Sequence, residues 1–315
     1  MVAETIRLNS SLDGNSKNVD SPECRTCRST HTILIGHLPD VYEFAGRMYP
    51  RPLIGGSLWR CGACHFTFRH PIYDEAAYAD LYRSGSVQVW ESDLRREDLR
   101  LVSQRIERGG FINVLDVGCY TGKLLSMLPS RCKLHGIEVN RAAARIAAER
   151  GVSIVAHTFE DFEQVDSHFD VIIACDVIEH VVNPITFLRS LRGHLKTGGQ
   201  AIITTGDADN WLWRIARSNF WYCFFPEHIS FVGRKWLTSM PQQAGFQISE
   251  LLTFNYSPSW RSPISLLSAL IYAKAPSLYR SLRGTAHDHY RERDSVTPPG
   301  LGATADHVMC IMTAA

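Results

Sequence analysis

The chain has 315 residues, a net charge of +1, and 45% apolar and 21% charged residues. These values are ordinary for a globular protein, and the near-neutral charge argues against nucleic acid as a main partner. No apolar run approaches the roughly 18 residues that a membrane-spanning helix needs. Residues 1–20 are rich in Ser, Asn and Asp and lack the apolar core of a secretion signal, so we expect a disordered tail on a cytoplasmic protein.

Residues 21–72, called here the N-terminal module, are predicted to bind zinc. The ligands are the cysteines of two C-x-x-C pairs: Cys24, Cys27, Cys61 and Cys64. Four thiolates can close a tetrahedral site without an open position, so the metal would be structural. The alternatives are four unrelated buried thiols or a redox pair, although neither pair opens a helix as a redox motif would. Between the pairs, residues 32–59 alternate apolar and polar side chains, which predicts a β-hairpin.

Residues 73–110 are predicted to form a helical linker or cap. An acidic first turn starts a helix at 74–82, and a charged helix at 91–108 ends at two glycines. The aromatic side chains of Tyr78, Tyr82 and Trp90 either close over a cofactor or pack the N-terminal module onto the next domain.

From residue 111 onward, strands and helices alternate, which predicts a doubly wound, Rossmann-like α/β domain with a mostly parallel seven-stranded sheet. The strands are expected near 112–117, 133–138, 152–156, 169–175, 200–205, 246–254 and 305–313. The helices are expected near 121–129, 140–150, 183–195 and 233–244. Residues 255–304 form an insertion before the last strand.

The stretch at 114–125 reads as a strand that turns tightly into a helix, with glycines where the backbone must approach a ligand. A second strand ends in Glu138, roughly 20 residues on, which is the spacing of an acid that binds ribose hydroxyls. The D-x-G-x-x-x-G pattern from Asp116 to Gly122 resembles motif I of class I S-adenosylmethionine-dependent methyltransferases. Tyr120 stands where that family usually has a glycine.

This resemblance implies S-adenosylmethionine as the cofactor. Asp116 would orient its amino-acid end, the glycines would allow close approach, and Glu138 would bind the ribose. The expected cofactor-binding residues are Asp116, Gly118, Cys119, Tyr120, Gly122, Glu138, Val139, Phe159, Glu160, Cys175 and Asp176.

The segment from Asp176 to His180 resembles the D/E-x-x-E-H segment of ubiquinone-biosynthesis O-methyltransferases. In that family the matching positions hold a divalent ion near the substrate oxygen, so the resemblance makes Asp176, Glu179 and His180 candidate metal ligands. In relatives without the ion the histidine is a base or a structural residue. Glu179 and His180 are therefore also candidate catalytic residues.

Residues 211–228 are dense in aromatic side chains, which indicates that they cover something apolar. They end in Pro226-Glu227-His228, which resembles the substrate-side segment of the same group of families. His228 is therefore a second candidate base, or a capping residue if the aromatic residues are simply core.

The insertion contains an apolar helix at 263–273, followed by arginines at positions 280, 283, 291 and 293. Residues 263–293 either lie on a membrane surface or, as we favour, form a helix packed on the domain. Residues 24–82 resemble, more loosely, a bacterial zinc module that precedes methyltransferase domains, some of which methylate nucleotide-linked sugars at carbon.

The sequence therefore predicts an S-adenosylmethionine-dependent methyltransferase domain at 111–315 that acts on an oxygen or carbon of a small molecule. A sugar, a secondary metabolite or a quinone-like ring would fit as acceptor. The alternatives are methylation of a lipid-linked glycan at a membrane surface, or a non-catalytic adaptor built on the zinc module. The sequence predicts neither the oligomeric state nor the acceptor.

Overall fold

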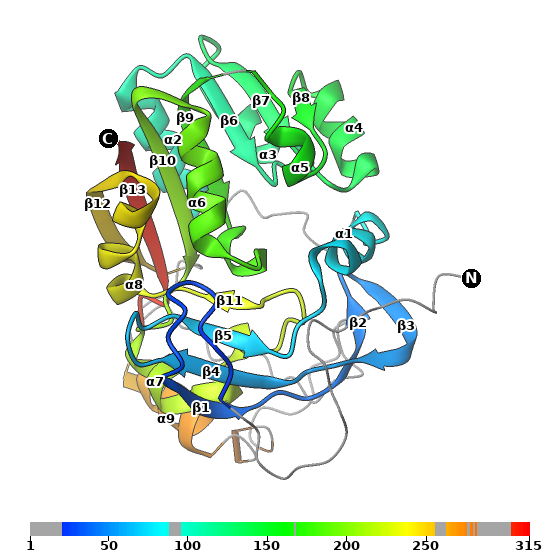
Figure 1. Cartoon of the computed structure of the whole chain (residues 1–315), viewed down its shortest axis with the longest axis vertical. Coiled ribbons are helices and arrows are strands. Elements are labelled where there is room, and N and C mark those ends of the chain that lie inside the picture. Colours follow the sequence, from blue (N-terminus) through cyan, green and yellow to red (C-terminus); the bar gives the residue numbers. More distant parts are fainter. Residues whose placement is uncertain are drawn as a thin grey trace.

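The computed structural model describes residues 21–87, 96–166, 168–255, 263–275, 278–279, 281 and 304–315 (Figure 1). Its centre is a seven-stranded sheet in the order β12-β13-β10-β9-β6-β7-β8. The strands are β6 (Asn113–Val117), β7 (Lys133–Ile137), β8 (Ser153–Ala156), β9 (Phe169–Cys175), β10 (Leu195–Gly206), β12 (Phe246–Phe254) and β13 (His307–Ala314). Strands β8, β7, β6, β9 and β10 are parallel, and β13 runs antiparallel to both of its neighbours. The predicted Rossmann-like fold is confirmed.

Strand β10 is longer than the predicted 200–205. The turn-like segment 196–199 lies inside the strand, where the pairing with β9 shifts register between Leu195 and Gln200. Gly198 adopts a φ of 73° there, a left-handed conformation that glycine takes without strain. A bulge thus replaces the helix stop that the sequence indicated.

The helices are α1 (Glu75–Arg83), α2 (Glu97–Gly109), α3 (Lys123–Ser126), α4 (Arg141–Glu149), α5 (Phe159–Phe162), α6 (Pro184–Gly193), α7 (Trp211–Ala216), α8 (Arg234–Ser239) and α9 (Pro263–Lys274). Asn140 and Asn183 cap α4 and α6 by accepting backbone N–H groups of the first turn. Helix α3 is shorter than the predicted 121–129. The predicted helix at 233–244 divides at Pro241, which has no N–H to continue it, into α8 and a 3-10 turn.

Both faces of the large sheet are buried, and the alternation along β9 shows it. Val171 and Ile173 pack in one apolar cluster, whereas Ile172 and Ala174 pack in another on the opposite face. Such a strand reads as a continuous apolar run because neither face meets water.

The N-terminal module forms a second, four-stranded sheet in the order β1-β4-β5-β11. Its strands are β1 (Thr32–His37), β4 (Ser57–Cys61), β5 (Thr67–His70) and β11 (Ser230–Phe231), and a separate hairpin joins β2 (Val41–Phe44) to β3 (Arg47–Leu53). The hairpin predicted within 32–59 is confirmed. Strand β11 comes from the part of the chain that forms the large sheet and pairs antiparallel with β5, so the small sheet is continuous across the two parts of the chain. Figure 1 shows this sheet at one end of the large one.

Several aromatic residues of 211–228 pack into an apolar cluster with the N-terminal module, whereas Trp211 is exposed. Trp213, Phe220 and Tyr222 lie in one cluster with Leu38 and Leu58, so the predicted apolar partner is the small sheet. Helix α9 joins the same cluster through Ala269, Tyr272 and Ala273. Within the described ranges, none of the helices has the length and apolar character needed to traverse a bilayer. The four arginines after α9 and the tail at 1–20 lie outside the described residues.

Candidate active site and four-cysteine centre

The loop after β6 is the first part of the site. Gly118, Tyr120 and Gly122 have φ values of 72°, 49° and 75°, all in the left-handed region. Glycine takes this conformation easily, whereas for tyrosine it is strained. Two hydrogen bonds hold Tyr120 there: its N–H donates to Glu138 Oε2 at 2.9 Å, and its hydroxyl donates to the carbonyl of Val87. The side chain therefore ties the loop to the segment after α1.

Cys119 lies on the inner side of the same loop. Its N–H donates to the carbonyl of Ile137 at 3.0 Å, and its buried thiol packs over Gly136. A Cβ at Gly136 would lie 2.4 Å from the sulfur of Cys119, so only glycine allows this approach. The loop after β6 is thereby seated against β7.

Glu138 follows β7 and is only 6% exposed. Its Oε1 accepts the N–H of Asn140 at 2.7 Å, while Oε2 accepts the N–H of Tyr120. Burial raises the pKa of this carboxyl, and the two N–H donors lower it. A carboxylate oxygen can accept more than one hydrogen bond, so both oxygens retain capacity for hydroxyl donors of a ligand.

Two more acids lie at the ends of adjacent strands, Asp116 in β6 and Asp176 after β9. Burial, and then the charge of Glu138, raises the pKa of Asp116 to about 8. The guanidinium of Arg96 forms ion pairs with Asp176 and with the buried Asp98 of α2. We call this group, together with the loop after β6 and Glu138, the cofactor end.

Arg96 was missed at the level of sequence, although a signal existed. It occupies the N-cap of α2 and makes no side-chain cap bond, whereas a short polar acceptor is preferred at that position. The remaining predicted cofactor residues lie nearby in sequence order. Val139 follows Glu138 and is half-buried, and Cys175 is the half-buried last residue of β9. Phe159 and Glu160 open α5, but their side chains lie outside the described part of the structure.

The second part of the site, here called the acceptor end, contains Glu179, His180 and His228. Glu179 is fully buried in a 3-10 turn after β9. Its Oε2 accepts the hydroxyl of Thr205 at 3.0 Å, and Oε1 accepts the hydroxyl of Tyr222. Burial, and then the charge of Asp176, raises the pKa of Glu179 to about 8.

The ring centroids of His180 and His228 lie 4.9 Å apart, and the rings meet edge to face. Nδ1 of His228 lies 2.8 Å from the carbonyl of Tyr222, and Nδ1 of His180 lies 3.1 Å from the carbonyl of Glu227 and 2.7 Å from the hydroxyl of Tyr82. A carbonyl only accepts hydrogen bonds, so the ring of His228 is assigned the Nδ1–H tautomer, which places its lone pair on Nε2. His180 contacts a hydroxyl and the backbone carbonyls of Glu227 and Asp176, so its tautomer is not assigned. Burial lowers the pKa of His180 to about 4 and that of His228 well below its ordinary value.

Tyr82 and Tyr78 thus take separate roles. Tyr78 packs with Phe44 of the N-terminal module in a cluster that also contains Ile229, as the packing alternative predicted. Tyr82 instead bonds His180 at the acceptor end. Trp90 lies outside the described residues.

One ligand atom each of Glu179, His180 and His228 lies within 4.8 Å of the others. The predicted metal group was Asp176, Glu179 and His180. Among the residues that the structure describes, His228 takes the place of Asp176 in this group, because Asp176 faces Arg96 at the cofactor end.

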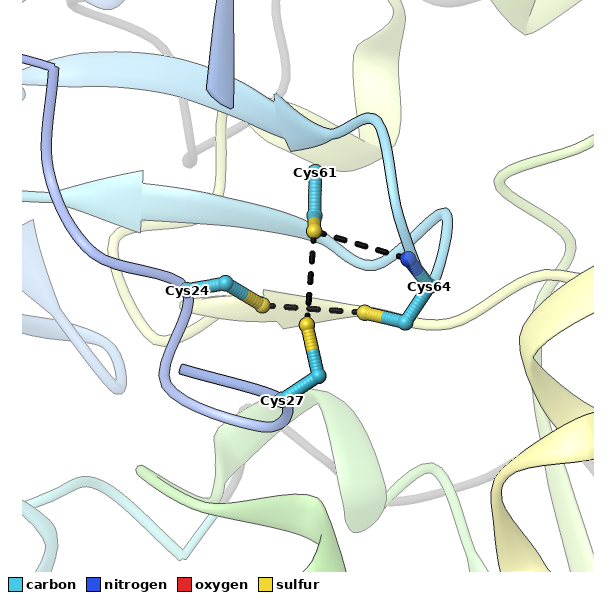
Figure 2. Close-up of side chains that lie close together, drawn as sticks. All are labelled: Cys24, Cys27, Cys61 and Cys64. Atoms are coloured by element: carbon cyan, nitrogen blue, oxygen red, sulfur yellow. Dashed lines mark hydrogen bonds between the residues drawn. The ribbon is translucent and has the colours of Figure 1, made fainter. Parts of the chain in front are cut away.

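The four cysteines of the N-terminal module converge from two turns, as Figure 2 shows. Sγ of Cys24 lies 3.6 Å from that of Cys64, and Sγ of Cys27 lies 3.5 Å from that of Cys61. These distances are far too long for disulfides. They approach the edge of about 3.8 Å expected for sulfurs placed tetrahedrally at 2.3 Å from Zn²⁺. The contact between Cys24 and Cys64 lowers the pKa of the Cys24 thiol and raises that of the Cys64 thiol, so it favours a thiolate at Cys24 alone.

The sequence of the chain is similar to those of known methyltransferases. The family described as "Methyltransferase domain" matches residues 90–251. An uncharacterized protein of Methanocaldococcus jannaschii is 25% identical over 48% of this chain and 71% of its own length. A ubiquinone biosynthesis O-methyltransferase of Rickettsia felis is 36% identical over 30% of this chain, but the match spans only 41% of that relative.

Two solved structures are similar to this chain. The N-methyltransferase NodS of Bradyrhizobium japonicum, in complex with S-adenosyl-L-homocysteine, superposes with a TM-score of 0.44 at 13% identity, covering 75% of this chain and 96% of NodS. The plantazolicin methyltransferase BpumL gives a TM-score of 0.46 at 16% identity, covering 72% and 88% of the two chains. Since the family match spans half of the chain, the chain belongs to the methyltransferase-domain family and is an S-adenosylmethionine-dependent methyltransferase.

Proposed function

We propose that this enzyme methylates an oxygen or carbon atom of a small-molecule acceptor bound at the acceptor end. The observation that carries the proposal is the pair of neutral histidines, His180 and His228, packed together beside the buried Glu179. His228 has its Nδ1 next to the carbonyl of Tyr222, which leaves its Nε2 to accept a proton, and His180 is the second candidate.

The cofactor end would bind S-adenosylmethionine at the carboxyl ends of β6 and β7, where open α/β sheets bind ligands. Glu138 would accept the two ribose hydroxyls, and the loop from Gly118 to Gly122 would allow the close approach of the cofactor. Asp116 would face the amino group, and Arg96 the carboxylate, of the amino-acid end. The proposal for Arg96 rests on its position among three acids, since both Asp98 and Asp176 bond it and its charge lowers the pKa of Asp116.

When bound, S-adenosylmethionine supplies a methyl group on a sulfonium sulfur. The protein must align the acceptor with that methyl group and remove the proton of the attacking hydroxyl or C–H group. His228 would take this proton on Nε2, with His180 as the second candidate, because the lowered pKa values keep both rings neutral at pH 7. The hydrogen bonds at Nδ1 hold the rings in the orientation that this transfer needs.

The aromatic surroundings favour an acceptor with a ring. The ring centroids of Tyr222 and Phe225 lie 4.2 Å and 5.0 Å from that of His228. A sugar, a secondary metabolite or a quinone-like ring carrying a hydroxyl would stack on such a wall. The ubiquinone biosynthesis O-methyltransferases among the relatives carry a quinone in their name, which supports the same class.

A second candidate role for the acceptor end is binding of a divalent cation by Glu179, His180 and His228. The proximity of their ligand atoms supports it, and two imidazoles with one carboxylate form a set that suits borderline transition metals. The ion would polarise the acceptor hydroxyl as a Lewis acid. Activity that a chelator abolishes and a divalent metal restores, at constant zinc content of the cysteine centre, would favour this role.

The N-terminal module would hold a structural zinc ion through Cys24, Cys27, Cys61 and Cys64. The sulfur distances and the all-thiolate donor set fit a closed tetrahedral site. We also propose the domain division of the sequence, with the module at 21–72 and the methyltransferase domain at 111–315.

The test is a transfer assay with S-adenosylmethionine labelled on the methyl group, against a panel of catechols, hydroxylated quinones and nucleotide-linked sugars. We expect labelled product from at least one ring hydroxyl or ring carbon, and its loss in His228→Gln at unchanged cofactor binding. Transfer only to amines or proteins, or product formation that His228→Gln and His180→Gln leave intact, would contradict the proposed chemistry.

A further inference from the structure

The two histidines lie on separate segments of the chain, 178–181 and 222–231, which hydrogen bonds join directly. The N–H of Ile229 donates to the carbonyl of Glu179 at 2.9 Å, and the hydroxyl of Ser230 donates to the carbonyl of Val181 at 2.6 Å. Residues 229–230 are therefore the brace that fixes the distance between His180 and His228.

Arg25 reaches this brace from the metal centre. It lies between Cys24 and Cys27, within one of the two cysteine turns. Its Nη2 donates to the carbonyl of Ile229 at 2.7 Å and to the hydroxyl of Ser230 at 3.1 Å. The guanidinium also lies 5.3 Å from the ring centroid of Phe68, and burial lowers its pKa only to about 10, so it stays charged at neutral pH.

Arg69 continues the connection to the loop that carries His228. The Nη1 of Arg25 donates to its carbonyl at 3.0 Å. The Arg69 guanidinium is buried at 2% exposure and donates to the carbonyls of Gly55, Cys223, Phe225 and His228 at 2.8–3.2 Å. A planar guanidinium with five N–H groups can hold several carbonyls in fixed directions, which an ammonium cannot do.

We infer that Arg25 is a positioning residue through which the four-cysteine centre sets the geometry of His180 and His228. The inference rests on the proposed function, because it assigns the acceptor end as the part that depends on the metal. Its physical basis is that a bound metal fixes the backbone of the Cys24–Cys27 turn, and Arg25 carries that constraint to the brace at 229–230. The same hydrogen bonds hold the turn that carries Cys24 and Cys27, so we expect loss of the Arg25 side chain to weaken metal binding as well.

The experiment compares zinc-loaded wild type with Arg25→Gln and with a matched control in the same turn, Arg28→Gln. Arg28 has a side chain 81% exposed and pairs with Glu23 at the surface. The readouts are the side-chain signals of ¹⁵N-labelled histidine, which report the tautomer, and the zinc affinity from competition with a chromogenic chelator. We expect Arg25→Gln to shift His228 away from the Nδ1–H tautomer and to weaken zinc binding by about tenfold. Arg28→Gln should change neither.

Unchanged histidine signals in Arg25→Gln would overturn the positioning role, and unchanged zinc affinity would overturn the link to the metal. If Arg25→Gln does not fold, Arg25→Lys decides by the same two readouts, because lysine keeps the charge but lacks the planar guanidinium. Neither readout needs a cofactor or an acceptor. A failure of wild-type protein to bind S-adenosylmethionine would therefore count against the proposed function and leave this inference to be judged separately.

Discussion

The cofactor end and the acceptor end are built in different ways. The cofactor end uses residues at the carboxyl ends of neighbouring strands of one sheet, such as Asp116 in β6 and Glu138 after β7, and much of its bonding is to adjacent loops. The acceptor end gathers side chains from α1, the turn after β9 and the loop before β11, and a buried arginine of the N-terminal module binds the last of these. The cofactor end is built mainly within the alternating strands and helices of the large sheet. The acceptor end depends on contacts between segments that are far apart in the sequence.

This difference indicates which part of the enzyme can change without altering the other. The proposed cofactor end is built from the parallel sheet, its loops and the start of α2. The position of the acceptor end depends on the small sheet, because β11 is a strand of that sheet and directly follows His228. A change in the N-terminal module should therefore affect the acceptor end before it affects the cofactor end.

The largest effect is expected from Cys64→Ser. Loss of one ligand should reduce bound zinc from about one per chain to a small fraction and lower the melting temperature strongly, because structural zinc contributes roughly 10 kcal/mol or more of folding free energy in small zinc domains. Zinc content and thermal unfolding report on the N-terminal module, and calorimetry with S-adenosylmethionine reports on the cofactor end. Cys132→Ser, at a half-buried cysteine of the large domain, is the control. If cofactor binding were lost to the same extent as zinc, the cofactor end would not be independent of the N-terminal module.

A second prediction concerns His228→Gln. Removal of a general base typically costs 10²–10⁴-fold in rate, so methyl transfer to the acceptor found by the screen should fall by about that factor. The dissociation constant of S-adenosylmethionine should stay within about twofold, since the ring lies at the other end of the site. His37→Gln, at an exposed histidine of β1, is the control. Loss of cofactor binding in His228→Gln would show that the two ends are not separable.

A third prediction addresses the cofactor end alone. Glu138→Ala should weaken binding of S-adenosylmethionine by about 1.5–3 kcal/mol, the scale of a charge-assisted hydrogen bond, and it also removes the acceptor for the N–H groups of Tyr120 and Asn140. Calorimetry measures the effect. Glu149→Ala, at the exposed end of α4, should bind as wild type does. If Glu138→Ala binds equally well, the ribose role is wrong.

The large sheet was predictable from the sequence because its strands carry their own signal. The apolar run of β9 and the strand-then-acid pattern at Asp116 and Glu138 follow from burial of both sheet faces and from ligand binding at the carboxyl ends. What failed was local: β10 begins before the predicted strand, and Pro241 divides a predicted helix. These details depend on register and on single residues rather than on periodicity.

The acceptor end was predictable only in its parts. His180, Glu179 and His228 were identified from short segments, but nothing in their spacing shows that the two rings lie 4.9 Å apart. The roles of Tyr82, Arg25 and Arg69 were beyond reach for the same reason, since their partners lie about 100 or more residues away along the chain. Such contacts are set by how the small sheet joins the large domain, which no periodic pattern encodes.

The smallest predicted effect, a pH dependence, tests the cofactor end from its electrostatics. Burial raises the pKa of Asp116 to about 8, so at pH 7 this carboxyl is mostly protonated in the unliganded enzyme. The proposed contact with the cofactor's ammonium group favours the carboxylate, so binding should release protons and strengthen by at most about tenfold per pH unit between pH 6 and 8. Calorimetry in buffers of different ionisation enthalpy counts the protons. The stability of the unliganded protein should change in the opposite direction. Between about pH 4, the ordinary pKa of an unfolded aspartate, and pH 8, the folded state binds one proton at Asp116 that the unfolded state has lost. The free energy of unfolding should therefore fall as the pH rises through this range. Asp116→Asn should flatten the dependence of binding and remove one of two contributions to that of stability, because Glu179 also has a pKa raised to about 8. Proton release that persists in Asp116→Asn would assign it to another group.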